Sequence, residues 1–188
     1  MQTLGLSDST IRSESRLRSL FWPSIQSGAD VDYLAVQGFW VCTIVGVISL
    51  ATLCFAGQPI TGILVFLIFH LGGVGVREHN PFAAVVMLAY YGLDWLAAPG
   101  FSVVRIILTA LLLSNVRATW IAGGWKADSE EAVLPPRLTE TFFDKLADTW
   151  PAFIWPKVKV LYYIFSLGFL AVVVAGVIVM RLKGGALR

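Results

Sequence analysis

Two charged residues lie inside apolar stretches of this chain, and their spacing predicts an ion pair. Asp94 belongs to the run Pro81–Pro99 and Arg105 to the run Phe101–Trp120, and the runs are joined at Pro99-Gly100. If both runs are helices folded back about that joint, the two residues lie at equal depth, each about 8 Å from the turn. An unpaired charge at such a depth in lipid costs several kcal/mol. We therefore predict that Asp94 and Arg105 pair across the hairpin.

The chemistry open to this pair is either structural or functional. Ionisable groups within membrane spans are candidates for proton or ion transfer, and pairing with another subunit is a third option. Asp94 is the one acidic residue of the hairpin, and no series of carboxylates leads across the membrane from it. A pair that fixes the register of the two helices fits this pattern better than a relay does.

His70 is the residue whose type suits it to holding a cofactor. It lies about 10 Å inside a charged elbow at 77–80, and a single imidazole can ligate the iron of a haem or the magnesium of a chlorophyll-type pigment. A bis-histidine haem would need a second buried histidine, whereas His79 lies in the elbow itself. The alternative is a hydrogen bond across helices to Tyr90, Tyr91 or a Thr or Ser hydroxyl.

A second cation, Arg117, stands at the opposite end of the hairpin formed by the third and fourth runs. An extended arginine side chain reaches about one helical turn toward the interface, and Glu78 lies at that level. The spacing predicts either a clasp between Glu78 and Arg117 or the binding of an anionic lipid headgroup by Arg117.

Three glycines, Gly72, Gly73 and Gly75, stand near the end of the apolar run Ile60–Val76. Small residues let helix backbones approach closely, which drives helix association where lipid offers no hydrophobic contrast. A phosphate-binding loop is the other interpretation, but neither a preceding strand nor a following Lys-Ser/Thr supports it. We expect these glycines to be helix-packing positions.

The remaining residues offer no arrangement typical of an enzyme. The sequence shows no nucleophile with a base and an orienting group, no Cys or His pair at metal-binding spacing, and no paired carboxylates within one span. Corresponding broken helices in two halves, as in transporters built from repeats, do not occur either. We expect no catalytic residues and no metal site.

The elements that must position these residues are membrane-spanning helices. Apolar residues make up 57% of the 188 and charged residues 14%, whereas soluble domains are about a quarter charged. The apolar residues fall in blocks of the length that a helix needs to cross a bilayer, without the period-two alternation of a barrel. We predict an all-α polytopic membrane protein with about five transmembrane helices and interfacial amphipathic helices. The net charge of +2 does not suggest nucleic acid binding.

Turn residues and charge runs divide the chain into four parts. These are a cytoplasmic N-terminal tail with an interfacial segment (1–33), a four-helix transmembrane core (34–122), a cytoplasmic loop with an amphipathic helix (123–156), and a C-terminal transmembrane helix with a short basic tail (157–188). The amphipathic helix is expected over Thr139–Trp150 and the last span over Val158–Met180. Trp-Pro pairs at 150–151 and 155–156 indicate interfacial elbows at which proline breaks the helix.

The basic residues predict the orientation of the chain. With five spans and a cytoplasmic N-terminus, ten Lys and Arg residues lie inside and three outside, and Arg105 is buried. The positive-inside rule therefore places the N-terminus in the cytoplasm. The cationic C-terminal tail falls outside, and we expect this to be tolerated because the tail comes last.

Three short motifs carry a resemblance to a known group of proteins. They are Gly72-Gly-Val-Gly-Val-Arg77, Ala83-Ala84-Val85 and Asn115-Val116-Arg117-Ala118-Thr119-Trp120. Over residues 72–122 the chain resembles a loose group of small, uncharacterised bacterial polytopic inner-membrane proteins, whose helix pair ends in Val-Arg-Gly-Thr-Phe or similar. Here Ala118 stands in place of the usual Gly and Trp120 in place of the usual Phe. The resemblance implies a fold and a bacterial inner membrane, and nothing catalytic.

These features together lead us to expect a non-catalytic integral membrane subunit or accessory protein that packs within a larger membrane complex. The chain has little soluble mass, a glycine face on its second span and an amphipathic helix suited to docking. Other membrane-protein subunits are the expected partners, and a homo-oligomer stays open. The runner-up is a small oligomeric channel or transporter that uses Asp94 and Arg105. The third interpretation is a pigment- or haem-binding subunit through His70.

Overall fold

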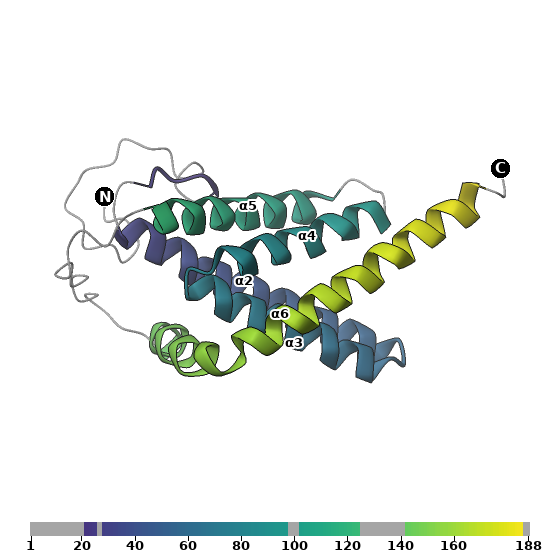
Figure 1. The fold of residues 1–188 in the computed structure, drawn as a ribbon, viewed down its shortest axis with the longest axis horizontal. Helices are drawn as coiled ribbons and strands as arrows, with labels where there is room; N and C mark the ends of the chain where they lie inside the picture. The colour runs from purple at the N-terminus through teal and green to yellow at the C-terminus, as the bar shows by residue number, and fades with distance from the viewer. Residues whose placement is uncertain (1–20, 26–27, 98–101, 125–141, 186–188) are drawn as a thin grey trace.

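The computed structural model describes residues 21–25, 28–97, 102–124 and 142–185; within its helices, the side chains of residues 29, 94, 96, 97, 124 and 183–185 lie outside the description. The described part folds into five helices (Figure 1). They are α2 (Gly28–Phe55), α3 (Pro59–Arg77), α4 (Pro81–Ala97), α5 (Val103–Gly124) and α6 (Phe142–Gly185). The predicted all-α class is confirmed.

Helix length and composition make the chain a multi-pass membrane protein. Four helices, α2, α3, α5 and α6, are long and apolar enough to cross a bilayer. The fifth, α4, has 17 residues, which is about the lower limit for a spanning helix. The predicted runs and the helices agree closely, and the main difference at the start is that α2 begins at Gly28, ahead of Leu34.

Consecutive helices run up and down beside one another, so that both ends of the bundle collect helix termini. Figure 1 shows α2, α4 and α6 beginning at the same end at which α3 and α5 finish. The tight turn between α2 and α3 depends on Gly57, whose φ of 75° lies in the left-handed region that glycine enters without strain. Pro59 then starts α3, where its missing N–H costs nothing.

The core lies where α2, α3, α4 and α6 meet. Its fully buried side chains include Phe39 of α2, Val74 of α3 and Met87 of α4. From α6, Trp155 and Tyr162 complete the same cluster. Large aromatic side chains from one helix thus fill the space beside the glycines of another, which fixes how the helices pack.

The expected break between the amphipathic helix and the last span is wrong. α6 is one helix of 44 residues that contains Pro151 and Pro156. Figure 1 shows the green first turns of α6 nearly end-on, whereas the yellow remainder runs across the view, so the helix bends rather than ends. A proline removes one backbone hydrogen bond and kinks a helix. Here Pro151 and Trp155 are both buried, and that packing keeps the helix continuous.

Candidate functional site

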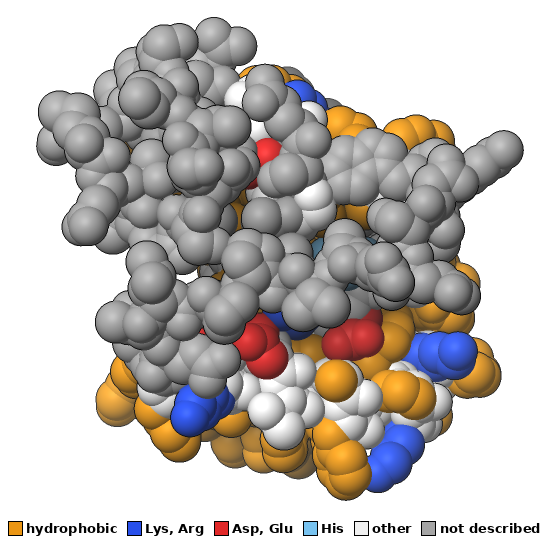
Figure 2. All heavy atoms as spheres, turned by 90° about the vertical axis from the view of Figure 1, so that its left-hand side faces the viewer, with side chains coloured by type: hydrophobic (Ala, Val, Ile, Leu, Met, Phe, Trp, Pro, Cys, Tyr) orange, Lys and Arg blue, Asp and Glu red, His pale blue; other side chains and the backbone are white. Residues whose placement is uncertain are grey.

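Charged side chains gather at the end of the bundle where α2, α4 and α6 begin. Figure 2 looks onto this end and shows Asp and Glu side chains close to Lys and Arg side chains, with grey atoms covering the upper part. We call it the polar end. Two layers of polar contacts join α2, α3 and α6 here, and each layer has a residue of α3 in its middle.

The outer layer is centred on Arg77, the last residue of α3. Its Nη1 lies 2.6 Å from Oδ1 of Asp32 on α2, and its Nη2 lies 2.8 Å from Oδ1 of Asp148 on α6. The Arg77 side chain is 12% exposed and that of Asp32 14%, so this pair is largely shielded from water, whereas the Asp148 side chain is 40% exposed. A planar guanidinium can hold two carboxylates in fixed directions, which a lysine ammonium does less well. Arg77 thereby ties three helices together.

The turn after α3 holds Arg77 in place through the backbone. The N–H of Asn80 donates to the Gly75 carbonyl at 2.9 Å and that of His79 to the Val76 carbonyl at 3.0 Å, which is the Schellman pattern of a helix end. Asn80 also caps α4, because its Oδ1 accepts from the N–H of Ala83 at 3.0 Å. Its Nδ2 donates to the Tyr163 hydroxyl at 2.7 Å, so the turn is attached to α6 as well.

His79 sits in this turn with an unusual backbone and a shifted pKa. Its φ of 53° is left-handed, which few residues other than glycine and asparagine adopt readily. Burial lowers the pKa of His79, the Arg77 cation lowers it further, and Asp32 partly raises it again. The neutral imidazole is therefore the form that the fold favours.

We expect acid to weaken the fold through His79. A histidine whose pKa is lower in the folded than in the unfolded chain contributes its full stability above about pH 6.5, and this is lost as the pH falls toward the folded pKa. His79→Asn keeps a residue that accepts a left-handed φ and removes the titration. Its melting temperature in detergent should depend less on pH between about 7 and 5 than that of the wild type. Equal slopes for the two proteins would show that His79 contributes nothing.

The inner layer is centred on His70, two helical turns before Arg77 on α3. Its Nδ1 lies 3.2 Å from the Thr43 hydroxyl on α2, and its Nε2 accepts the indole N–H of Trp150 on α6 at 3.1 Å. An indole nitrogen only donates, so Nε2 carries no proton and the neutral ring holds its proton on Nδ1. The imidazole also stacks on Phe66, at a centroid distance of 5.5 Å. A threonine is thus one partner, as the sequence allowed, whereas Tyr90 donates to the Ser166 carbonyl instead.

Both ring nitrogens of His70 make hydrogen bonds, so a cofactor metal would have to replace one of them. A metal bound at Nε2 would have to displace the Trp150 N–H, and one at Nδ1 would replace the contact with Thr43. Among the residues with described side chains, no group of three or more His, Cys, Asp or Glu is placed to hold a metal ion. The observed hydrogen bonds attach His70 of α3 to α2 and α6, and its role as a haem or pigment ligand stays a prediction.

Trp150→Phe tests the inner layer. The substitution keeps an aromatic ring but leaves Nε2 of His70 without its donor, which should destabilise the protein by about 1 kcal/mol. Thermal unfolding in detergent should show a melting temperature a few degrees lower. Trp120→Phe is the matched control, because the Trp120 side chain is 73% exposed. Equal melting temperatures for the two variants would contradict a stabilising bond at His70.

The three predicted packing glycines all lie against neighbours. A Cβ built on Gly75 would come within 2.5 Å of the Ala83 Cβ and of the Trp155 ring, and one on Gly73 within 2.9 Å of the Cys42 Cβ. At Gly72 a Cβ would meet the sulfur of Met87. No side chain fits at these positions without a shift of a neighbour.

The other residues singled out in the sequence have different outcomes. The Asp94 side chain lies outside the described residues, so its pairing with Arg105 stays a prediction, although α4 and α5 do pack as a hairpin. Nη1 of Arg117 donates to the Pro23 carbonyl at 2.8 Å, and its guanidinium lies 5.0 Å from the centroid of the Trp22 ring. The clasp with Glu78 and the headgroup contact of Arg117 likewise stay predictions.

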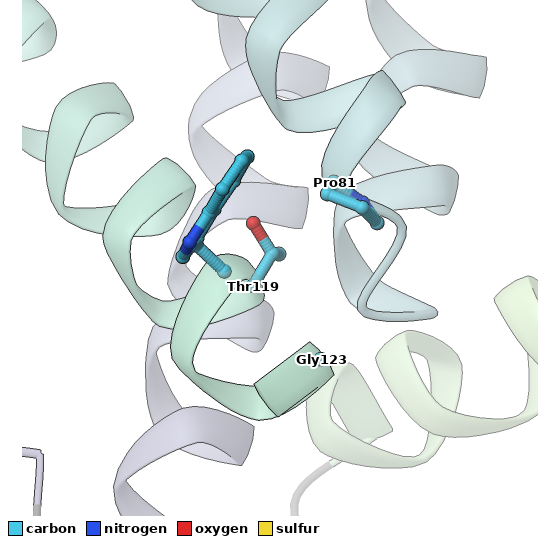
Figure 3. A pocket seen from close by; sticks show the side chains of 4 residues that line it. Pro81, Thr119 and Gly123 are labelled. Carbon is cyan, nitrogen blue, oxygen red and sulfur yellow. The ribbon is translucent and has the colours of Figure 1, made fainter. Parts of the chain in front are cut away.

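A shallow hollow opens between the start of α4 and the end of α5. Its volume is about 300 Å³, and Pro81, Thr119, Trp120 and Gly123 line it. Figure 3 shows Pro81 and Thr119 facing each other across it. The Thr119 hydroxyl already donates to the Val116 carbonyl at 2.9 Å. None of the described residues that line the hollow is charged, so they offer little to orient a polar ligand.

Sequence reasoning missed the partners of Arg77 and His70, although signals existed. Arg77 and His70 are seven residues apart and so lie on one face of α3. Asp32 and Thr43 are eleven residues apart on α2, which is close to three turns and again one face. The sequence predicts Asp148 and Trp150 on a separate amphipathic helix, and that prediction does not bring them into contact with α3.

Comparison with protein-family models, with curated proteins and with solved structures finds no match for this chain. The geometry of the polar end and of α6 is therefore what bears on function. At the polar end Arg77, Asp32 and Asp148 join three helices through ion pairs.

Proposed function

We propose that this protein is a non-catalytic integral membrane subunit or accessory protein that packs within a larger membrane complex. The observation that carries the proposal is the far half of α6, which leaves the rest of the bundle. The hydrophobic cluster reaches along α6 as far as Val173. From Val174 to Leu182 no side chain is buried, and Figure 1 shows this yellow end standing apart from α2 to α5.

The surface of this half of α6 suits a second helix. Cβ atoms built at Gly168 and Gly176 meet nothing within 4 Å, so both glycines present open backbone. By helical periodicity Gly168, Ala175 and Gly176 lie on one side of α6. Close contact between small residues is a main source of helix association in lipid, because lipid tails are as apolar as the side chains they would replace. Val172, four residues from each glycine, lies between them on this side, and the large apolar side chain of Ile178 is also exposed.

The polar contacts support a structural rather than a catalytic role. Arg77, His70 and Asn80 each connect elements of the same bundle. Each does so through two of its polar side-chain atoms. Side chains committed in this way are poorly placed to bind or transform a substrate. The amphipathic start of α6 was expected to dock on partners, but its inner face already packs on α2 and α3.

We further propose a bacterial inner membrane with the polar end in the cytoplasm. The membrane type comes from the resemblance over residues 72–122. The orientation follows from the greater number of cations at the polar end, which include Arg77, Arg117 and Lys157, compared with Arg181 at the far end of α6.

The test is purification from native membranes in a mild detergent, followed by a native mass measurement. We expect a companion chain in fixed stoichiometry, which can be a second copy or another subunit. Gly168→Leu/Gly176→Leu should lose that companion, because the leucines would separate the two helices. Gly123→Leu is the control, since Gly123 on α5 also faces open space. A monomer without a companion, or a companion retained by the double variant, would contradict the proposal.

A further inference from the structure

The leading segment of α6, Phe142–Lys159, lies at the polar end, ahead of the long apolar part of the helix. The Asn80 side chain, in the turn between α3 and α4, donates to the Tyr163 hydroxyl and so fixes the depth of α6. Lys157 and Lys159 precede Tyr163 by six and four residues, on the side away from the bilayer centre. The first turns of α6 run across the long axis of the bundle, as an interfacial helix does (Figure 1).

The charges of the leading segment are sorted by sign. Lys145, Lys157 and Lys159 are all exposed, whereas Asp144 and Asp148 are partly buried. Asp148 is turned toward the bundle, where it pairs with Arg77. Asp148 is thus compensated by Arg77, and the charged residues of the segment that are exposed rather than partly buried are its three lysines. Figure 2 shows Lys and Arg side chains beside hydrophobic ones along the lower edge of this end.

Aromatic side chains accompany these lysines on the surface. Phe142 is 74% exposed and Phe153 59% exposed. The Lys157 ammonium lies 3.4 Å from the centroid of the Phe153 ring, so its stem follows the apolar surface while its charge is at the outer edge. Exposed aromatics beside lysines are typical of the boundary between acyl chains and headgroups.

We propose that the leading segment of α6 binds anionic phospholipid headgroups, with Lys157 and Lys159 as the groups that contact phosphate. Charge complementarity favours lipid over a protein partner. Lysine is strongly hydrated and is depleted in protein interfaces, while the headgroup layer stays hydrated and carries negative charge. The binding is independent of the proposed complex, because it uses the opposite end of α6 from Gly176.

Quenching of the intrinsic tryptophan fluorescence by brominated lipids tests this inference. The full chain is reconstituted into phosphatidylcholine vesicles that contain either brominated phosphatidylglycerol or brominated phosphatidylcholine, and the ratio of apparent binding constants is measured. We expect the wild type to prefer the anionic lipid. In Lys157→Gln/Lys159→Gln the ratio of binding constants should fall roughly fivefold for each lysine removed. Lys157→Arg/Lys159→Arg should keep it.

The matched control is Arg181→Gln, an exposed cation at the other end of the same helix, whose preference should equal that of the wild type. A wild type without preference, an unchanged double glutamine variant, or an equal loss in Arg181→Gln would overturn the proposal. Inorganic phosphate and sodium chloride at equal ionic strength should weaken the preference equally by screening. A far stronger effect of phosphate would assign the lysines to a free anion instead, and would also overturn it.

Discussion

Arg77→Met is expected to destabilise the protein by about 3 kcal/mol, chiefly because it leaves the largely buried Asp32 carboxylate without its cation, while the more exposed Asp148 adds less. Asp32 and Asp148 would then repel each other across the space that the guanidinium fills. For a chain of this size the melting temperature in detergent should fall on the order of 10 °C. Circular dichroism at the helical band, followed on heating, measures this.

Two further variants separate the charge of Arg77 from its bulk. Adding Asp32→Asn and Asp148→Asn to Arg77→Met removes the uncompensated charges, and we expect the triple variant to recover part of the lost stability. Arg181→Met removes an exposed cation from α6 and should change the melting temperature far less than Arg77→Met does, because contacts of exposed charges contribute little. If Arg77→Met behaves like Arg181→Met, the ion pairs at the polar end contribute nothing to the fold.

Gly75→Ala should destabilise the protein, because it adds a methyl group at a close contact between helices. The new Cβ would lie 2.5 Å from the Ala83 Cβ and from the Trp155 ring, and both neighbours are buried. Alanine cannot rotate away, and Ala83 is held by the start of α4, so α3 must separate from α4 and α6. Overpacking of this kind costs about 1–3 kcal/mol.

Gly92→Ala is the control, because it adds the same methyl group to a helix without a steric conflict. Alanine is favoured over glycine within a helix by up to about 1 kcal/mol, so a substitution without steric conflict should stabilise. Gly92 lies in α4 with nothing within 4 Å of an added Cβ, and its alanine variant should melt at the wild-type temperature or above. Opposite shifts for the two variants are expected, and a rise in melting temperature for Gly75→Ala would refute the close approach of the helices.

The two predictions concern different links between the same helices. Arg77 attaches α3 to α2 and α6 through ion pairs at the polar end, and Gly75, two residues earlier, lets α3 pack closely against α4 and α6. A combined variant should lose more than either alone but less than their sum, since both act on the packing of α6.

The sequence alone determined the class of the protein and the approximate extent of its helices. An apolar block of about 20 residues has few alternatives in a bilayer, because each backbone N–H and C=O must be satisfied within the segment. Turn residues such as Gly57 and Asn80-Pro81 then mark where one helix ends and the next begins. The sequence also predicted the packing role of the glycines before Arg77, because small residues in an apolar helix let a neighbouring helix approach closely.

Only the tertiary structure decided which residues meet. Depth along a helix can be counted from a turn, but rotation about the helix axis cannot be read when a helix is apolar on most sides. The pairing of Arg77 with Asp148 spans 71 residues and depends on the bend of α6 at Pro151 and Pro156, which the sequence indicated as a break. Packing of Pro151 and Trp155 in the core offsets the missing hydrogen bonds, and this brings Asp148 and Trp150 to α3.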